Sequence, residues 1–473
     1  MILTAVNLLT ATWWPVPWTD EALFLDPAAN FFFHHQFTSS LWHTQPYGEF
    51  WISNAPLYSF FLAAWLKIFG FGVLAARSLN LFLHGVWLWI CLDWAIQRWR
   101  FRPIQCLVLA LLLTLPNSLA FMARNGRYDM LACLVSTFLA IGLVEGRRTK
   151  TVSAAVGFLM PWVSLPTLVF TLSTIGWLAP RSSRWGHALL HMLGGLCGFT
   201  ALAVFAGEKI GFLHFIGILQ NLYLSVPSGS LPERLASTWI NISGFAADRF
   251  WILAAPALAF FSRCRGLGNL PGMRDGRLLR WIWAGACSGL VFALVYKMNI
   301  LYLWTITVPL AFLFSSSWLG FCDGAKGGVA IFGLGVVLMI TGLPGRLVLG
   351  FGQRNTWHDN SARIRETVGS RGKETKPVIC YTEWPFYYDV KDKNTLVLGP
   401  DFVVGAQRAG PVPEIYFLSP GSRLPDLSRD LRRIDRGRAD IPPQAGRENL
   451  LARLAGSGIN RMPEVEIWAL AKP

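Results

Sequence analysis

Long apolar segments alternate with short polar ones through the first three quarters of the chain. A helix that crosses a membrane needs roughly 20 mostly apolar residues, or about 17 at the short end. The segments that approach this length are residues 1–18, 73–97, 104–122, 129–145, 152–180, 187–206, 250–262, 281–296, 300–320 and 328–349. The pattern predicts an all-α polytopic membrane protein.

The longest apolar run, residues 152–180, contains no charged residue. Pro161 and Pro166 interrupt it, and each removes a backbone donor and disfavours helix at the residue before it. Both flanks are basic, so the run is expected to enter the membrane from the cytoplasm and return as a hairpin of two short helices. Counted twice, it brings the prediction to about eleven transmembrane helices.

Two further apolar segments are predicted to lie along the membrane surface. Residues 56–70 are short for a span and include Lys67, and a crossing here would put every later basic cluster on the wrong side. Residues 22–37 are rich in phenylalanine, which suits a helix beside the lipid headgroups. Both segments are therefore expected to be interfacial helices.

Composition indicates a membrane-embedded body followed by a separate soluble unit. Over the whole chain 53% of residues are hydrophobic and 15% are charged, against about 25% charged in soluble proteins. From Gly352 onward, however, 19 Lys and Arg and 15 Asp and Glu make up half of all the charged residues. The chain is therefore predicted to divide into a transmembrane domain, residues 1–351, and a C-terminal domain, residues 352–473.

The C-terminal domain is predicted to be a small α/β domain. Short apolar stretches favour strands at residues 378–381, 395–398, 414–418 and 465–469. Wider apolar spacing favours helices at residues 424–434 and 447–455.

The net charge of +15 comes from short clusters of Lys and Arg between the apolar segments. Such clusters orient membrane proteins because cytoplasmic loops retain basic residues, whereas a nucleic-acid interface would gather them on one face. No nucleic-acid partner is therefore expected. If the basic clusters lie in the cytoplasm, the remaining polar segments are predicted to share the extracytoplasmic side of the cell (inner) membrane. These segments are the loops 19–55 and 207–249, the turn 124–127, residues 297–299 and the C-terminal domain.

The loop 19–55 holds four carboxylates and no lysine or arginine: Asp20, Glu21, Asp26 and Glu49. It follows the first apolar segment, where a base can reach both a lipid-borne and a soluble substrate. The alternative for Asp20 is an N-cap of the following helix. Capping alone does not account for a loop without cations, so an acidic face that serves a general base is the favoured interpretation.

A second set of ionisable residues surrounds the start of the segment 129–145. A carboxylate at the depth of Asp129 is costly unless it is paired or used, and an ion pair with Arg124 or Arg127 is the structural alternative to a catalytic role. The two arginines are also suited to bidentate contacts with a phosphate. Lys297 is expected on the same face, either as a phosphate ligand or as a snorkelling lysine at a helix end.

Candidate metal ligands are weaker. His34, His35 and His43 have no metal-site spacing, and the eight cysteines indicate neither a disulfide framework nor a zinc site.

Several of these elements occur together in an order that resembles a known family. They are Asp20-Glu21, the sequence from Asn54 to Tyr58, Leu66 to Gly70 with Ala75-Ala76-Arg77, Arg127 to Met130, and Lys297 through Tyr302 to Pro309. In order and spacing, residues 1–350 resemble the GT-C glycosyltransferases, in particular the protein O-mannosyltransferase and aminoarabinose lipid A transferase group.

The resemblance implies an enzyme that moves a sugar from a polyprenyl-phosphate carrier to an extracytoplasmic acceptor, which can be lipid, polysaccharide or protein. Asp20 would then be the catalytic base, with Glu21 beside it and Asp129 as the second acidic residue. The predicted substrate-binding residues are Arg124, Arg127, Lys297, Tyr302, Glu49 and Tyr58. No cofactor is required by this chemistry, although a divalent metal would be compatible with it.

Two departures from the family bear on these expectations. The first apolar segment is short and has no basic residue ahead of it, so the start is expected to be truncated. Residues 152–180 also lack the lysine that relatives often have in their paired short helices, which weakens the expected phosphate site.

Two other classes of protein compete with the enzyme. A transporter or flippase of a lipid-linked sugar would tend to place charges at mid-membrane in repeated halves, and the sequence has no repeat. A scaffold whose C-terminal domain binds a partner would not need the acidic loop. Neither the sugar nor the acceptor can be read from the sequence.

Overall fold

A computed structural model of the chain describes residues 11–12, 17, 19–42, 45, 48–52, 56–114, 116–145, 149–223, 276–295, 304–322, 343–371, 378–399, 414–418, 431–436 and 465–470. Most of the described residues are helical. The helices are α2 (Thr19–His34), α3 (Pro56–Phe69), α4 (Val73–Trp99), α5 (Pro103–Thr114), α6 (Asn117–Arg124), α7 (Asp129–Glu145), α8 (Thr149–Val163), α9 (Thr167–Leu178), α10 (Arg184–Ile210), α11 (Phe212–Tyr223), α15 (Arg277–Val295), α16 (Trp304–Cys322), α18 (Leu343–Arg371) and the short α19 (Tyr387–Val390).

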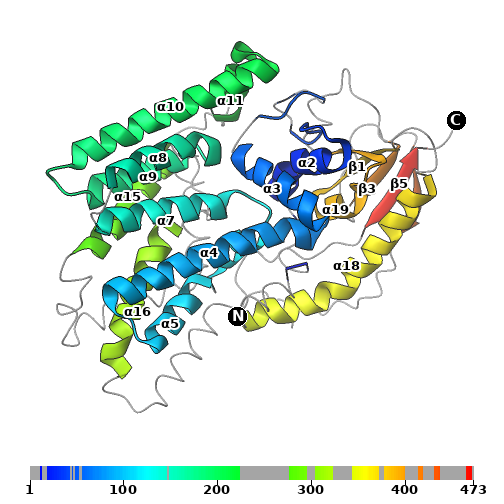
Figure 1. The fold of residues 1–473 in the computed structure, drawn as a ribbon. Coiled ribbons are helices and arrows are strands. Elements are labelled where there is room, and N and C mark those ends of the chain that lie inside the picture. Colours follow the sequence, from blue (N-terminus) through cyan, green and yellow to red (C-terminus); the bar gives the residue numbers. More distant parts are fainter. Residues whose placement is uncertain are drawn as a thin grey trace.

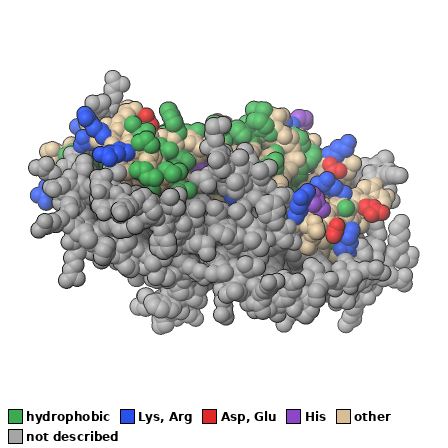
Figure 2. Space-filling model, turned by 90° about the horizontal axis from the view of Figure 1, so that it is seen from below, with side chains coloured by type: hydrophobic (Ala, Val, Ile, Leu, Met, Phe, Trp, Pro, Cys, Tyr) green, Lys and Arg blue, Asp and Glu red, His purple; other side chains and the backbone are tan. Residues whose placement is uncertain are grey.

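Two of the described helices, α4 and α10, are long and apolar enough to cross a membrane, each with 27 residues. Both expose large apolar side chains, such as Trp89 (67% exposed) on α4 and Leu196 (62%) on α10. In Figure 2, hydrophobic side chains occupy the middle of the visible described surface and Lys and Arg lie toward its ends. This outward apolar surface is what a lipid environment requires. The predicted number of spans remains a prediction.

The predicted hairpin in residues 152–180 consists of α8 and α9, and the break falls at Ser164–Pro166 rather than at Pro161. Both helices pack on α10. Ala154 and Phe158 of α8 face Gly194 and Gly198 in the same order, so α8 runs parallel to α10. Thr171 and Leu168 of α9 meet α10 in the reverse order, at His191 and Gly195, so α9 runs back.

Glycine allows α8 and α10 to come into backbone contact. A Cβ atom placed on Gly198 would lie 2.1 Å from the carbonyl oxygen of Phe158, and one on Gly194 would lie 2.2 Å from that of Ala154. The two glycines are four residues apart, the spacing that brings small residues to one face of a membrane helix.

One predicted span is wrong, because it is not a single continuous helix. Residues 104–122 do not make a single helix but two, α5 and α6, because Pro116 stands between them. The predicted spans 250–262 and most of 1–18 and 328–349 lie outside the described residues.

The five-stranded sheet lies near the C-terminus, with the strands in the order β2-β1-β3-β5-β4. They are β1 (Val378–Thr382), β2 (Thr395–Leu398), β3 (Ile415–Leu418), β4 (Leu431–Arg436) and β5 (Glu466–Leu470). β1 pairs in parallel with β2 and β3, whereas β5 pairs antiparallel with β3 and β4. Four of the strands confirm the sequence prediction.

The predicted helix 424–434 is wrong in its last part, because residues 431–434 belong to β4. Pairing of this edge strand with β5 outweighs the helical spacing of its apolar residues. The other predicted helix, 447–455, lies outside the described residues.

The sheet and the helical body are in contact. In Figure 1, α2 and α3 lie beside the sheet and α19, while α18 extends from the helical part toward the sheet. α18 runs without a break through the predicted boundary between residues 351 and 352, and the division into two domains remains a prediction.

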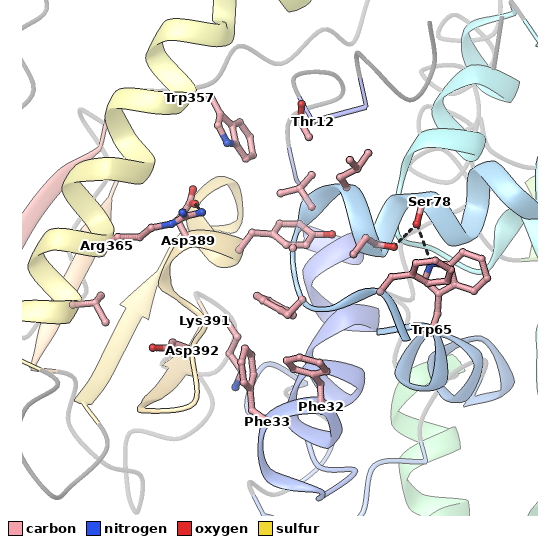
Figure 3. A pocket seen from close by; sticks show the side chains of 18 of the residues that line it. Thr12, Phe32, Phe33, Trp65, Ser78, Trp357, Arg365, Asp389, Lys391 and Asp392 are labelled. Atoms are coloured by element: carbon pink, nitrogen blue, oxygen red, sulfur yellow. Dashed lines mark hydrogen bonds and ion pairs between the residues drawn. The ribbon is translucent and has the colours of Figure 1, made fainter. Parts of the chain in front are cut away.

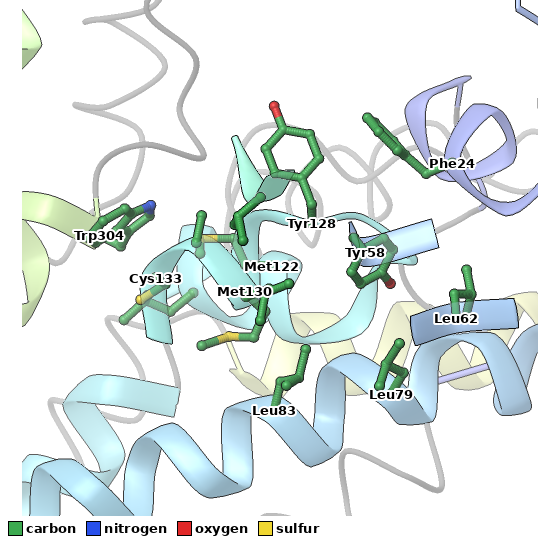
Figure 4. Packing of buried hydrophobic residues seen from close by; sticks show 14 of the residues in the cluster. Phe24, Tyr58, Leu62, Leu79, Leu83, Met122, Tyr128, Met130, Cys133 and Trp304 are labelled. Atoms are coloured by element: carbon green, nitrogen blue, oxygen red, sulfur yellow. The ribbon is translucent and has the colours of Figure 1, made fainter. Parts of the chain in front are cut away.

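Buried aromatic residues connect α2, α3 and the start of α7. Phe24 packs edge-on against Tyr128 with ring centroids 5.0 Å apart, and Tyr58 is fully buried in the same cluster. Figure 4 shows these rings above the leucines of α4. These rings pack α2 against α3 and the start of α7.

Candidate active site

Glu21, in the first turn of α2, forms a buried ion pair with Arg77 of α4. The Glu21 carboxylate accepts hydrogen bonds of 2.7 Å from both Nε and Nη2 of Arg77, and neither side chain is exposed to solvent. The third donor of Arg77, Nη1, binds the carbonyl of Ala11 at 2.6 Å. Such a bidentate pair satisfies the guanidinium in the protein interior.

Asp20 points elsewhere, as neighbouring residues of a helix must. Its carboxylate lies 2.6 Å from Nη1 of Arg127, and 32% of its side chain is exposed, whereas the side chains of Glu21 and Asp129 are fully buried. α2 begins at Thr19, so Asp20 lies inside the first turn rather than at the N-cap. Solvent can therefore reach the Asp20 carboxylate but not those of Glu21 and Asp129.

Arg127 bridges the two predicted acidic positions. Its Nε lies 3.0 Å from Asp129 Oδ2 while its Nη1 binds Asp20. The guanidinium also lies over the ring of Tyr128, 5.1 Å from its centroid. The ion pair between Asp129 and an arginine, foreseen as an alternative in the sequence, is therefore present.

The turn that carries Arg127 is held by α4 and by Glu21. The side-chain amide of Asn80 donates to the carbonyls of Asn125 and of Arg127, the latter at 2.7 Å. A Cβ atom on Gly126 would lie 3.1 Å from Cγ of Glu21, so only glycine fits without displacing that side chain. The acidic pair and the arginine turn thus contact each other directly.

Asp26, one of the carboxylates expected on the acidic face, is instead fully buried at the centre of a second polar cluster. Its carboxylate accepts hydrogen bonds from Ser39 Oγ (2.7 Å), the Ser40 backbone amide (2.7 Å) and Tyr387 Oη (2.6 Å), and Lys391 Nζ lies 3.6 Å away. Asp26 therefore fastens α2 to α19.

The residues of α19 and the lysine after it were not foreseen. Tyr388 Oη donates a 2.9 Å hydrogen bond to Glu21, and Lys391 binds the Asn30 side chain at 2.5 Å. Burial, followed by the charge of Glu21, raises the pKa of Tyr388 well above that of a free tyrosine, so its hydroxyl stays protonated and acts as the donor. Burial also lowers the pKa of Lys391.

A useful sequence signal existed for Arg77, a charged residue within an apolar helix, which by itself indicates a buried partner. For Tyr387 and Tyr388 the pattern offers no signal, because their partners lie 361 and 367 positions away.

A cavity beside this network has a volume of 1090 Å³ and lies between the α3–α4 corner and the α18–α19 region (Figure 3). One wall is aromatic, with Phe32, Phe33 and Trp65, and the opposite side includes Arg365 and Asp389. Tyr388 lines the cavity and its hydroxyl donates to Glu21, so this residue connects the cavity wall to the acidic pair.

The other predicted substrate-binding residues are more dispersed. Tyr58 is fully buried, and its pKa is raised by burial, then by the nearby Glu21 and Asp129. Arg124 is buried at the end of α6. Glu49 instead contacts Gln45 at 3.4 Å and His214 at 3.1 Å.

Two of the predicted ligands, Lys297 and Tyr302, lie outside the described residues. Within the described part of the chain, no three His, Cys, Asp or Glu side chains gather in a way that could hold a metal ion. This observation does not test whether the proposed chemistry needs a metal, which stays a prediction.

Comparisons with known proteins support the fold suggested by the sequence. No protein-family model matches the chain, and no curated protein matches it. Two solved structures of ArnT from Cupriavidus metallidurans match over 100% of this chain and 98% of theirs: one bound to undecaprenyl phosphate (14% identity, TM-score 0.55) and one in the apo state (15%, 0.56). A weaker match, to the oligosaccharyltransferase of Archaeoglobus fulgidus in the apo form, has 10% identity and a TM-score of 0.41, and covers 88% of this chain and 69% of that one.

The match to ArnT extends over the whole chain, including the sheet near the C-terminus. The predicted resemblance to the GT-C fold is thereby confirmed as a likeness of fold.

Proposed function

We propose that this protein is a membrane glycosyltransferase that moves a sugar from a polyprenyl-phosphate carrier to an acceptor hydroxyl on the extracytoplasmic side. The main supporting observation is the exposure of Asp20, which lies 2.6 Å from Arg127 among carboxylates that are fully buried. The fold shared with ArnT, one structure of which holds undecaprenyl phosphate, supports a polyprenyl-phosphate donor.

In the proposed reaction the acceptor oxygen attacks the anomeric carbon of the sugar. The bond from that carbon to the phosphate oxygen breaks, its electron pair leaves with the lipid phosphate, and the anomeric centre is inverted. Asp20 accepts the hydroxyl proton, and such general-base assistance contributes typically about 10² to 10⁴ in rate. The phosphate departs as an anion and needs no proton from the enzyme.

Arg127 is proposed to hold the base rather than to bind the phosphate. Its guanidinium is already engaged by Asp20 and Asp129, at 2.6 and 3.0 Å. Arg124 and Lys297 are therefore the remaining proposed phosphate ligands, which would offset the negative charge that grows on the leaving group. Burial of Glu21 and Asp129 likewise favours a supporting role for both.

The alternative is a transporter or flippase for the same kind of lipid. A transporter would bind and release the lipid-linked sugar unchanged, so formation of a glycosylated product separates the two functions. The large cavity beside Tyr388 is compatible with either one.

The decisive experiment incubates membranes containing the protein with polyprenyl-phosphate sugars of several kinds and follows transfer of the labelled sugar. Wild type is compared with Asp20→Asn and with a matched control, Asp93→Asn, on α4 and hydrogen-bonded to Gln97. We expect transfer by wild type and the control, and loss of about 10² or more in rate for Asp20→Asn. Transfer that survives in Asp20→Asn would remove Asp20 as the base, and no transfer by wild type from any donor would favour the transporter.

A further inference from the structure

We propose that Tyr388, contributed by the C-terminal part of the chain, is a positioning residue of the transfer site that acts through Glu21 and the Gly126 turn on Asp20. The inference rests on the proposed function. It adds a role for a region far from the acidic pair in sequence.

The first step of the argument is the contact between Tyr388 and Glu21. The hydroxyl donates to Glu21 Oε1 at 2.9 Å, the same oxygen that accepts from Arg77 Nε at 2.7 Å. Tyr388 is largely buried, and its raised pKa keeps the proton on the hydroxyl at neutral pH. Glu21 is therefore held from two sides, by a helix of the membrane body and by α19.

The second step joins Glu21 to the turn that carries Arg127. A Cβ atom on Gly126 would be 3.1 Å from Glu21 Cγ and 3.6 Å from Tyr388 Oη. Tyr388 and Glu21 thus form the wall against which this turn packs. Arg127 follows directly and reaches Asp20 at 2.6 Å.

The third step is that α19 has a fixed place from which Tyr388 can act. All four residues of α19 are buried. The neighbouring Tyr387 donates to Asp26 at 2.6 Å, and Lys391 donates to Asn30 at 2.5 Å. Together with the bond from Tyr388 to Glu21, these two contacts fasten α19 to α2 at three positions. A displacement of about 1 Å at a reacting group is enough to cost up to about 10²-fold in rate.

The test replaces Tyr388 by phenylalanine, which removes the hydroxyl and keeps the ring. Tyr416→Phe is the matched control, because the Tyr416 hydroxyl is buried in β3 and has no hydrogen-bond partner among the described residues. With purified protein, kcat and KM are measured for a polyprenyl-phosphate sugar that the wild type accepts, together with the unfolding temperature.

We expect Tyr388→Phe to lower kcat about 10-fold, with KM for the donor within about 2-fold of wild type, because positioning affects the transition state more than binding. Tyr416→Phe should leave both constants unchanged. Gly126→Ala provides a second variant, because its added methyl group would press on Glu21 beside the Tyr388 hydroxyl. It too should lower kcat at a nearly unchanged KM.

An unchanged kcat in Tyr388→Phe would overturn the inference. If that variant does not fold, the decision falls to Gly126→Ala, and an unchanged kcat there has the same meaning. Failure of the proposed function gives a different result, because the wild type would then show no transfer. The present inference fails when the wild type transfers the sugar, Asp20→Asn does not, and Tyr388→Phe has the same kcat as the wild type.

Discussion

Glu21 and Arg77, 56 positions apart in the chain, form a bidentate ion pair with neither side chain exposed to solvent. The pair ties the first turn of α2 to α4. It also leaves the adjacent Asp20 as the member of the acidic pair that remains accessible.

Removing one partner of this pair is expected to be much worse than removing both. Glu21→Leu leaves a buried guanidinium without its carboxylate and should destabilise the fold by about 3–5 kcal/mol. Glu21→Leu combined with Arg77→Leu should recover most of that loss, because apolar residues replace both charges. Unfolding of the three proteins in the same detergent checks this, and a double variant as unstable as the single one would contradict it.

Arg127→Lys should retain the fold but lose most of the activity. A lysine carries the charge but offers one compact ammonium group, which cannot bridge Asp20 and Asp129 as the planar guanidinium does. We expect kcat/KM to fall about 10- to 100-fold. Steady-state transfer measurements decide this, with Arg354→Lys on α18 as a control, and activity close to wild type would rule out the bridging role.

Gly198→Ala should destabilise the packing of α8 on α10. The added methyl group would lie 2.1 Å from the carbonyl oxygen of Phe158, and relieving such an overlap costs typically about 1–3 kcal/mol. Gly85→Ala on α4 is the matched control, because a Cβ there meets nothing within 4 Å. Thermal unfolding should separate the two variants, with Gly85→Ala equal to or more stable than wild type.

Asp389 should make stability depend on pH. Burial raises its pKa above that of an ordinary aspartate, about 3.9, so the folded protein retains this proton when the unfolded chain has lost it. Its contribution to stability is therefore fully present below the ordinary value and is lost as pH rises through the higher folded value. Asp389→Asn removes this dependence.

The measurement for Asp389 is the unfolding temperature of both proteins across that acidic window. The difference between wild type and Asp389→Asn should shift in favour of the variant as pH rises. Parallel pH curves for the two proteins would show that Asp389 does not titrate differently in the folded state.

Much of the helical framework could be predicted because it depends on local apolar length. The helix α7 begins and ends where the apolar pattern does, and the charge-free run 152–180 gives the pair α8 and α9. Pro116 shows the limit of this reasoning, since the apolar length of residues 104–122 predicts one continuous helix and the proline divides it into two. The strand β4 shows another limit, because its state depends on a distant strand.

The candidate site was predictable in its residue types but not in its pairings. Position and charge predict Asp20, Asp129 and Arg127 as site residues. The structure places the Asp20 and Asp129 carboxylates 2.6 and 3.0 Å from the Arg127 guanidinium. The sequence does not predict which carboxylate of the Asp20–Glu21 pair is buried and which is exposed, because this depends on the ion pair between Glu21 and Arg77. Side-chain burial depends on tertiary packing, which the adjacent residues in the sequence do not determine.

The contact between Glu21 and Tyr388 also has a consequence for biosynthesis. At an elongation rate of about 5–20 residues per second, the 367 positions between them correspond to tens of seconds of translation. During that interval the nascent α2 can meet Arg77, but its remaining hydrogen-bonding capacity must be met by water or by other transient partners. Maturation of the acidic pair is therefore a late event, completed only after the ribosome has delivered Tyr388.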